Sequence, residues 1–220
     1  MVYPADQGNV IVQLHNQGDR PALVQNWVDA GNVQSTPENS RAPFVVLPPI
    51  ARVDPSAGQA LRIRFTGRPG ALPADRESLF WLNVLDIPPK AAPDGPTANR
   101  NYLQFAVRTR IKLFYRPAGL DGKASDAPGQ LVWSWQRGAD GTPRLVARNP
   151  TAYHVTLTGL MLAGSDRDLI AQSRMLAPGE THRWPVTGDD ATRQKRLSIT
   201  AINDYGATQT YESTVSKRDD

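Results

Sequence analysis

The chain has 220 residues and no cysteine, and its 25 Lys and Arg residues against 21 Asp and Glu residues give a net charge of +4. This length allows two domains of about 100 residues, each with its own core. The lack of cysteine excludes disulfide bonds and thiol chemistry, and 17 glycines and 19 prolines favour many short strands joined by turns over a bundle of helices.

A series of strand-like segments runs through the first half of the chain. In residues 60–65, apolar residues alternate with arginines, as expected of a strand whose successive side chains point to opposite faces. Segments rich in Pro and Gly separate these strands, and the spacing is typical of an immunoglobulin-like sandwich. We predict strands at residues 9–14, 22–29, 44–47, 60–65 and 78–85.

An unusually long alternating segment, residues 102–115, follows. At roughly 3.3 Å per residue it would extend about 45 Å, so we predict that part of it continues beyond the sheet that anchors it. A long strand with unpaired edge groups also invites a partner strand. One face carries Leu103, Phe105, Val107, Thr109, Ile111, Leu113 and Tyr115, and the other carries Gln104, Arg108, Arg110, Lys112 and Arg116.

The alternation stops at residues 117–130, which are rich in Gly, Ala, Asp and Pro. Because these residues bury little and turn easily, we place a domain boundary here. The predicted all-β domains are residues 1–118 and 119–220. In the second we predict strands at residues 131–136, 144–149, 154–162, 173–176, 181–185, 197–203 and 209–215.

Four separated motifs occur in this chain: DRESLFWLNVLDIPP at residues 75–89, RIKLFYRP at 110–117, RNPTAYHVTL at 148–157 and INDYGA at 202–207. Together they resemble the periplasmic pilus-assembly chaperones of the chaperone-usher pathway, the PapD-like family, in the family's order and spacing. The resemblance implies two immunoglobulin-like β-sandwich domains in a boomerang arrangement. It also implies a location in the periplasm of a Gram-negative bacterium and delivery of pilus or fimbrial subunits to an outer-membrane usher.

By this resemblance, the long strand binds subunits. The family's subunits are incomplete sandwiches that lack one strand, and the chaperone lends them its own, here through Leu103, Phe105 and Val107. Each of these side chains would contribute about 1.5 to 3 kcal/mol on filling the subunit's groove, before ordering costs, while the backbones pair edge to edge. The alternative is that the three side chains face the core of their own domain. The sequence leaves open whether unbound molecules associate with each other through the same strand.

Lys112 lies on the opposite face of this strand. The resemblance implies that it binds the terminal carboxylate of the subunit and so fixes the register, because a one-residue slip would turn every side chain to the wrong face. A solvated lysine is the alternative. The family's second anchoring residue is an arginine that lies a couple of residues before the segment matched by residues 2–4. We therefore expect that this chain is truncated or that its start is assigned too late, so that this arginine, part of the first strand and the export signal are missing.

A second group of charged residues matches the family's cluster between its domains. These residues are Glu77, Arg116 and Asp204. The resemblance implies that they hold the angle between the domains, since an exposed pair alone would contribute only about 0 to 1 kcal/mol of stability.

Other classes of function receive less support from the sequence. It contains no nucleophile elbow and no phosphate-binding glycine loop, so we predict no catalytic residue, no enzymatic activity, no cofactor and no small-molecule substrate. The three histidines lie far apart, which predicts no metal site, and the basic residues lack the clustering of a nucleic-acid-binding protein. No apolar run approaches the roughly 20 residues that span a membrane. The main alternative is a carbohydrate-binding or adhesive β-sandwich, because five tryptophans offer rings that stack on sugars.

Overall fold

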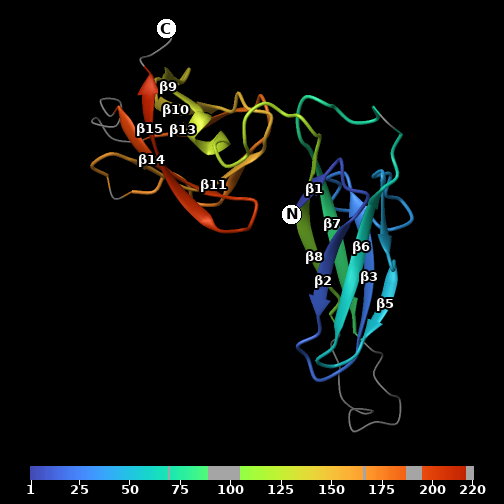
Figure 1. Cartoon of the computed structure of the whole chain (residues 1–220). Helices are drawn as coiled ribbons and strands as arrows, with labels where there is room; N and C mark the ends of the chain where they lie inside the picture. Colours follow the sequence, from blue (N-terminus) through green and yellow to red (C-terminus); the bar gives the residue numbers. More distant parts are fainter. Residues whose placement is uncertain (69, 89–104, 166, 187–194, 217–220) are drawn as a thin grey trace. The chain divides into compact units, whose positions relative to one another are not determined.

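The computed structural model describes residues 1–68, 70–88, 105–165, 167–186 and 195–216. The chain folds into two compact units (Figure 1). Unit 1 consists of Met1–Pro73 and Ser78–Ala118, and unit 2 consists of Ala74–Glu77 and Gly119–Asp220. The short segment Ala74–Glu77 therefore packs with unit 2, although the strands on either side of it belong to unit 1.

Unit 1 is a sandwich of a five-stranded and a three-stranded sheet. The strands are β1 (Val2–Pro4), β2 (Val10–His15), β3 (Ala22–Asp29), β4 (Phe44–Leu47), β5 (Ile50–Val53), β6 (Gly58–Phe65), β7 (Ser78–Ile87) and β8 (Val107–Arg116). The larger sheet has the order β1-β8-β7-β3-β5 and the smaller one β2-β6-β4. Leu61 and Ile63 of β6 pack against Leu82 of β7 and Leu113 of β8, and all four side chains are fully buried.

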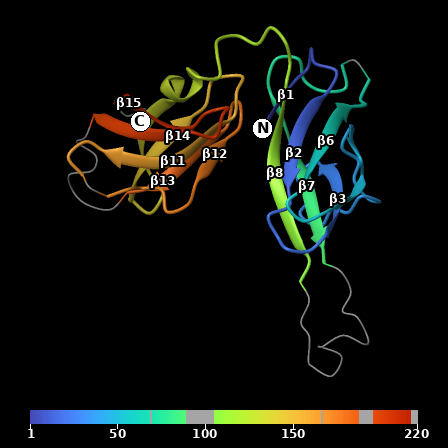
Figure 2. The ribbon, with the colours of Figure 1, turned by 60° about the horizontal axis from the view of Figure 1, so that its bottom comes forward.

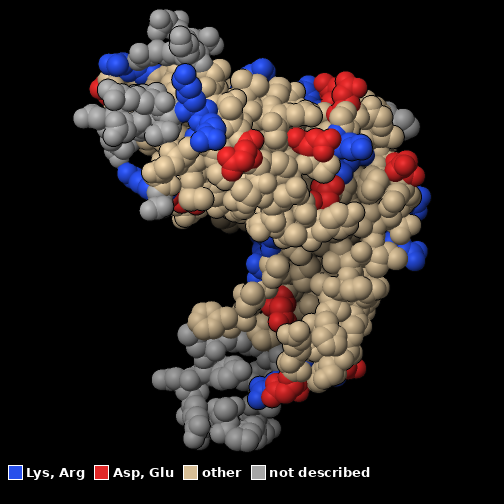
Figure 3. Space-filling view, turned by 60° about the vertical axis from the view of Figure 1, so that its left-hand side comes forward, with Lys and Arg blue, Asp and Glu red and all other residues tan. Residues whose placement is uncertain are grey.

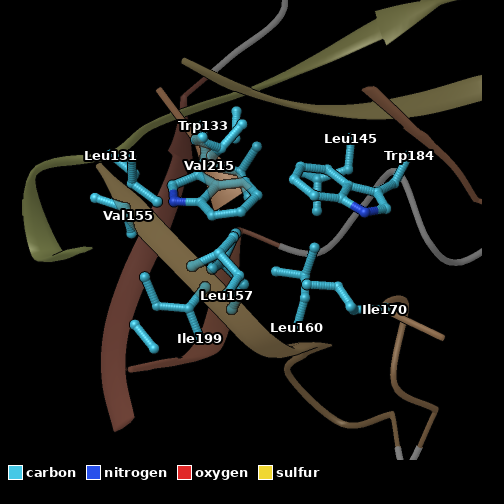
Figure 4. Packing of buried hydrophobic residues seen from close by; sticks show 14 of the residues in the cluster. Leu131, Trp133, Leu145, Val155, Leu157, Leu160, Ile170, Trp184, Ile199 and Val215 are labelled. Atoms are coloured by element: carbon cyan, nitrogen blue, oxygen red, sulfur yellow. The ribbon is translucent and has the colours of Figure 1, made fainter. Parts of the chain in front are cut away.

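Unit 2 is built from one seven-stranded sheet in the order β12-β11-β14-β15-β9-β10-β13. Its elements are η1 (Ala127–Gln130), β9 (Val132–Arg137), β10 (Pro143–Arg148), β11 (Val155–Leu162), β12 (Arg174–Leu176), β13 (Thr181–Pro185), β14 (Arg196–Ile202) and β15 (Thr208–Ser216). The two halves of the sheet face each other across an apolar core, in which Trp133 and Trp184 lie opposite Leu157, Leu160 and Ile199 (Figure 4).

The predicted fold class, two immunoglobulin-like β-sandwiches, is confirmed, and Ala22–Asp29, Phe44–Leu47 and Thr181–Pro185 match their predicted bounds. Two strands were not predicted, Val2–Pro4 and Ile50–Val53. Both are short, and pairing with strands that are distant in the sequence, β8 and β3, holds them in the sheet.

The predicted strand at residues 102–115 is longer than the observed one. Within the described residues, β8 begins at Val107, and Phe105 precedes it outside any strand. The cause is the length of its neighbour: β7 ends at Ile87, and the last pair of the ladder joins Asp86 to Val107. Leu103 lies outside the described residues.

Candidate functional site

One face of β8 changes from buried to exposed along the strand. Leu113 is fully buried, and Ile111 and Tyr115 pack against the same core. Toward the start of the strand this face leaves the core, because Val107 is 59% exposed and Phe105, just before the strand, is 70% exposed. The alternative that these two side chains belong to the core of their own sandwich is therefore wrong. Large apolar residues therefore continue the core face of β8 into solvent. In Figure 2, β8 is the long strand beside the short edge strand β1.

The backbone of β8 also has an open edge. The Phe114 amide donates to the Met1 carbonyl at 3.0 Å, and the Met1 amino group donates to the Lys112 carbonyl at 3.1 Å. Because backbone groups alternate along a strand, those of Arg108 and Arg110 face the same side, away from β7. The register of β1 with β8 begins only at Phe114. Among the described residues, no strand covers this edge at Arg108 and Arg110.

Lys112 lies on the outer face of the sheet, opposite the core, as its place in the sequence predicted. Its Nζ is 5.9 Å from the ring centroid of Trp81, its neighbour on β7. Burial lowers the pKa of the Lys112 ammonium from its ordinary value of 10.5. A partly desolvated cation of this kind attracts a carboxylate more strongly than a fully hydrated one does.

A buried carboxylate lies on the same outer face. The side chain of Asp29, at the end of β3, is only 1% exposed and accepts hydrogen bonds from Nη2 of Arg110 at 2.8 and 2.9 Å. The Arg108 guanidinium approaches it at 3.4 Å, and the amide of Asn83 donates to it at 2.8 Å. The sequence pattern places Arg108 and Arg110 on this face but does not reveal Asp29, because nothing in the pattern brings β3 to β8.

The three residues of the predicted charged cluster come from different elements of the two units. Glu77 is buried in unit 2, where its carboxylate accepts a bond of 2.7 Å from the backbone amide of His154 and lies 3.1 Å from Nδ1 of that ring. The backbone amide of Glu77 also donates to the Ala152 carbonyl at 2.9 Å. Arg116 ends β8 of unit 1, and Asp204 lies in the turn between β14 and β15 of unit 2. The cluster as a whole stays a prediction, and the partnership of Glu77 with His154 is new.

The tryptophans on which the carbohydrate-binding alternative depends are mostly buried. Trp27, Trp133, Trp135 and Trp184 are all less than a tenth exposed. The ring of Trp81 lies beneath the guanidinium of Arg110, 4.7 Å from its centroid. The described part of the chain therefore offers no row of exposed indole faces on which a sugar would stack.

Acidic and basic side chains are interspersed on the face that Figure 3 shows, and no large area of one sign stands out. Across the described ranges, no three His, Cys, Asp or Glu residues are grouped so that they would hold a metal ion. No helix in the same ranges has the length and apolar character needed to cross a membrane.

Comparison with known proteins gives two family matches that together span most of the chain. Residues 1–121 match the family described as "Pili and flagellar-assembly chaperone, PapD N-terminal domain". Residues 126–213 match "Pili assembly chaperone PapD, C-terminal domain".

Individual relatives agree with these matches. The chain is 41% identical to the probable fimbrial chaperone YadV of Escherichia coli over 94% of this chain and 83% of that protein. It is 39% identical to the chaperone protein FimB/FhaD of Bordetella pertussis over 98% of this chain and 85% of that protein.

Solved structures are similar over almost the full length. The CupB2 chaperone of Pseudomonas aeruginosa has a TM-score of 0.78 at 32% identity and covers 98% of this chain and 96% of its own. The SafB chaperone of Salmonella enterica, solved in complex with the SafA pilin, has a TM-score of 0.77 at 25% identity. The match covers 97% of this chain and 91% of the SafB chain.

Proposed function

This chain belongs to the PapD family of pilus-assembly chaperones, and from that premise we propose that it keeps incomplete pilus subunits soluble by lending them the open edge of β8 with Phe105 and Val107. Chaperoning of pilus subunits is the function of its family. The proposal concerns how this chain performs it and which residues take part.

The problem that such a chaperone solves is physical. A sandwich that lacks one strand exposes an apolar groove between two unpaired strand edges, and both features promote aggregation. A foreign strand that inserts apolar side chains at alternate positions fills the groove and pairs with the edges at the same time. This activity requires binding alone, so the proposal includes no catalytic step.

Exposed apolar side chains and an open backbone edge occur together at one place on β8, and this combination is the main support for the proposal. The side chains of Phe105 and Val107 are more than half exposed, and the backbone edge at Arg108 and Arg110 is uncovered within the described residues. An apolar side chain exposed alone is common on protein surfaces. An apolar face together with an open edge, at the end of a firmly anchored strand, is suited to strand donation.

Lys112 supplies the second element of the proposed mechanism. It follows the exposed segment by a few residues on the opposite face, and its ammonium is partly withdrawn from water. A subunit whose last strand ends in a carboxylate would place that group at Lys112 and thereby fix the register of pairing. The register decides whether the apolar side chains of β8 point into the groove or away from it.

We extend the proposal to location and partners on the strength of the family. The chain would act in the periplasm of a Gram-negative bacterium and pass its subunits to an outer-membrane usher. Before a subunit arrives, the exposed edge would be available to a second copy of the chain, so concentrated samples would contain dimers that dissociate on subunit binding.

The direct test is to produce each pilin subunit of the source organism in the periplasm of a host without fimbriae, alone and together with this chain. We expect at least one pilin that aggregates or is degraded alone to become soluble and to co-purify with the chain in a one-to-one complex. If no pilin is kept soluble, the proposed function is wrong. A sugar array probed with the same chain tests the carbohydrate-binding alternative, and we expect it to remain unlabelled.

A further inference from the structure

The first residues of β8 lack the support that strands normally have. A strand inside a sandwich is held by core packing on one face and by neighbours on both edges. Val107 and Thr109 are exposed where their face should meet the core, and the edge away from β7 is uncovered at Arg108 and Arg110 among the described residues. Within the described ranges, the ladder with β7 and the contacts of the outer face are what hold this segment.

The outer face of this segment is held by Asp29 and Asn83. Arg110 binds the Asp29 carboxylate through Nη2 at 2.8 and 2.9 Å, while its Nε donates to Oδ1 of Asn83 at 3.2 Å. Arg108 donates from Nε to the same Asn83 oxygen at 2.8 Å and from Nη2 to Asp29 at 3.4 Å. Asn83 is fully buried and also donates to Asp29. The two arginines that flank Thr109 are therefore bound to the same pair of buried side chains.

Aromatic rings and a backbone carbonyl complete these contacts. The Arg108 guanidinium lies 4.7 Å from the ring centroid of Trp27, and that of Arg110 lies 4.7 Å from the ring centroid of Trp81. Arg108 also donates from Nη1 to the Val33 carbonyl at 2.8 Å. The position and orientation of each guanidinium group are therefore fixed, because planar guanidinium groups stack on rings while forming directional hydrogen bonds.

The charge of Asp29 is needed to balance this arrangement. Burial lowers the pKa of Arg108, the nearby charge of Arg110 lowers it further, and Asp29 acts in the opposite direction. Without the carboxylate, two like charges would face each other over a partly desolvated surface, and Nη2 of each arginine would lose its acceptor. The segment would then be free to leave the outer face, and each residue that becomes disordered must be ordered again when a subunit binds.

We propose that Asp29 is a positioning residue that, through Arg108 and Arg110, holds the exposed start of β8 extended before a subunit arrives. This inference rests on the proposed function, in which that part of β8 pairs with the subunit. Asp29 itself lies on the face away from Phe105 and Val107, so it would act on subunit binding only through the order of the strand.

The test compares three single variants with the unaltered chain. Asp29→Asn keeps the shape of the side chain and removes its charge. Arg108→Gln is a milder variant, because Arg110 still pairs with Asp29, and it decides the question if Asp29→Asn does not fold. Asp54→Asn is the matched control, since Asp54 forms an exposed pair with Arg52 in the same unit at 3.0 Å.

Two readouts are measured: hydrogen exchange of individual backbone amides in the free chain, and affinity for the pilin that the unaltered chain captures. We expect Asp29→Asn to accelerate exchange at Val107 and Thr109 about tenfold or more and to weaken capture by about tenfold, with a smaller effect for Arg108→Gln. Exchange at Leu113, which the core anchors, should stay unchanged, and Asp54→Asn should change neither readout.

The inference is overturned if exchange at Val107 and Thr109 is unaltered in both variants, or if exchange at Leu113 rises equally, because Asp29 would then stabilise the unit as a whole. Unaltered capture by a variant with faster exchange also overturns it. If the unaltered chain captures no pilin, the proposed function fails separately, and exchange in the free chain still decides whether Asp29 orders the strand.

Discussion

The last strands of the two units, β8 and β15, are similar at one end and different at the other. Each pairs in parallel with the first strand of its own unit only near its end, β8 with β1 from Phe114 and β15 with β9 from Val215. At the opposite end, the core-facing positions of β15 continue into the polar, exposed Gln209, whereas those of β8 continue into Val107 and Phe105.

The difference shows that an edge strand alone does not make a binding site. In unit 2, the side chain of Tyr211 bonds to the Ser125 carbonyl at 3.0 Å and packs against the core, so a neighbouring segment partly covers β15. In unit 1, the corresponding part of β8 has no such cover among the described residues, and its exposed face carries the large apolar side chains of Phe105 and Val107. Natural sheets usually protect exposed edges with charged or polar residues, and β8 departs from this rule where subunit binding is proposed.

The largest effect is expected from making the exposed end of β8 polar, like that of β15. Phe105→Glu should lower the affinity for the captured pilin by more than about 1000-fold, because it removes a large buried side chain from the complex and forces a charge into an apolar groove. Titration calorimetry measures the change. Gln209→Glu places the same charge on β15 and serves as the control. Equal loss with both variants, or normal capture by Phe105→Glu, would exclude strand lending.

At the buried end of β8, truncating a side chain should lower the stability of unit 1. Leu113→Ala removes a fully buried side chain and should lower the free energy of unfolding of unit 1 by about 2 to 5 kcal/mol. Val107→Ala, on the same face, should change it by less than about 0.5 kcal/mol. Denaturant unfolding compares the two variants. Similar losses at both positions would mean that the exposed end is packed in solution.

A smaller effect is expected from the cation on the outer face. Lys112→Ala should weaken pilin capture by about tenfold, because a partly desolvated ion pair with the subunit's terminal carboxylate is lost. The fold should remain intact, as circular dichroism would show. Lys123→Ala, at an exposed position of unit 2, is the matched control. Full affinity in Lys112→Ala would remove the anchoring role of this residue.

The smallest effect concerns pH. Burial places the pKa of Lys112 in the folded chain below its unfolded value of 10.5. As pH rises through that lowered pKa towards 10.5, the folded chain loses the proton first, so burial of the charge no longer costs stability and the free chain becomes slightly more stable. Over the same range the cation that binds the subunit is lost, and capture should weaken. The Lys112→Arg variant keeps its charge, so its affinity for the pilin should not change over this pH range. A decline in affinity of equal size in that variant would assign the effect to another group.

The sequence predicted the parts of this molecule that depend on local pattern. Alternation identified most strands, and the four motifs at residues 75–89, 110–117, 148–157 and 202–207 together indicated the family. The features that it missed depend on contacts between distant residues. Asp29 lies 81 residues before Arg110, and Glu77 lies 77 residues before its partner His154. The length of β8 was overestimated for a similar reason, because its start depends on where β7 ends and not on its own alternation.

We expect the edge of β8 to be open in the free chain and closed by a bound subunit, and hydrogen exchange at single amides of β8 tests this most directly. In the free chain, the amides of Thr109 and Ile111, which face β7, should exchange slowly, whereas those of Arg108 and Arg110 should exchange rapidly. After pilin binding, Arg108 and Arg110 should become protected by about 100-fold or more. If these two amides are already protected in the free chain, or remain unprotected in the complex, the account of β8 as a lent strand is wrong.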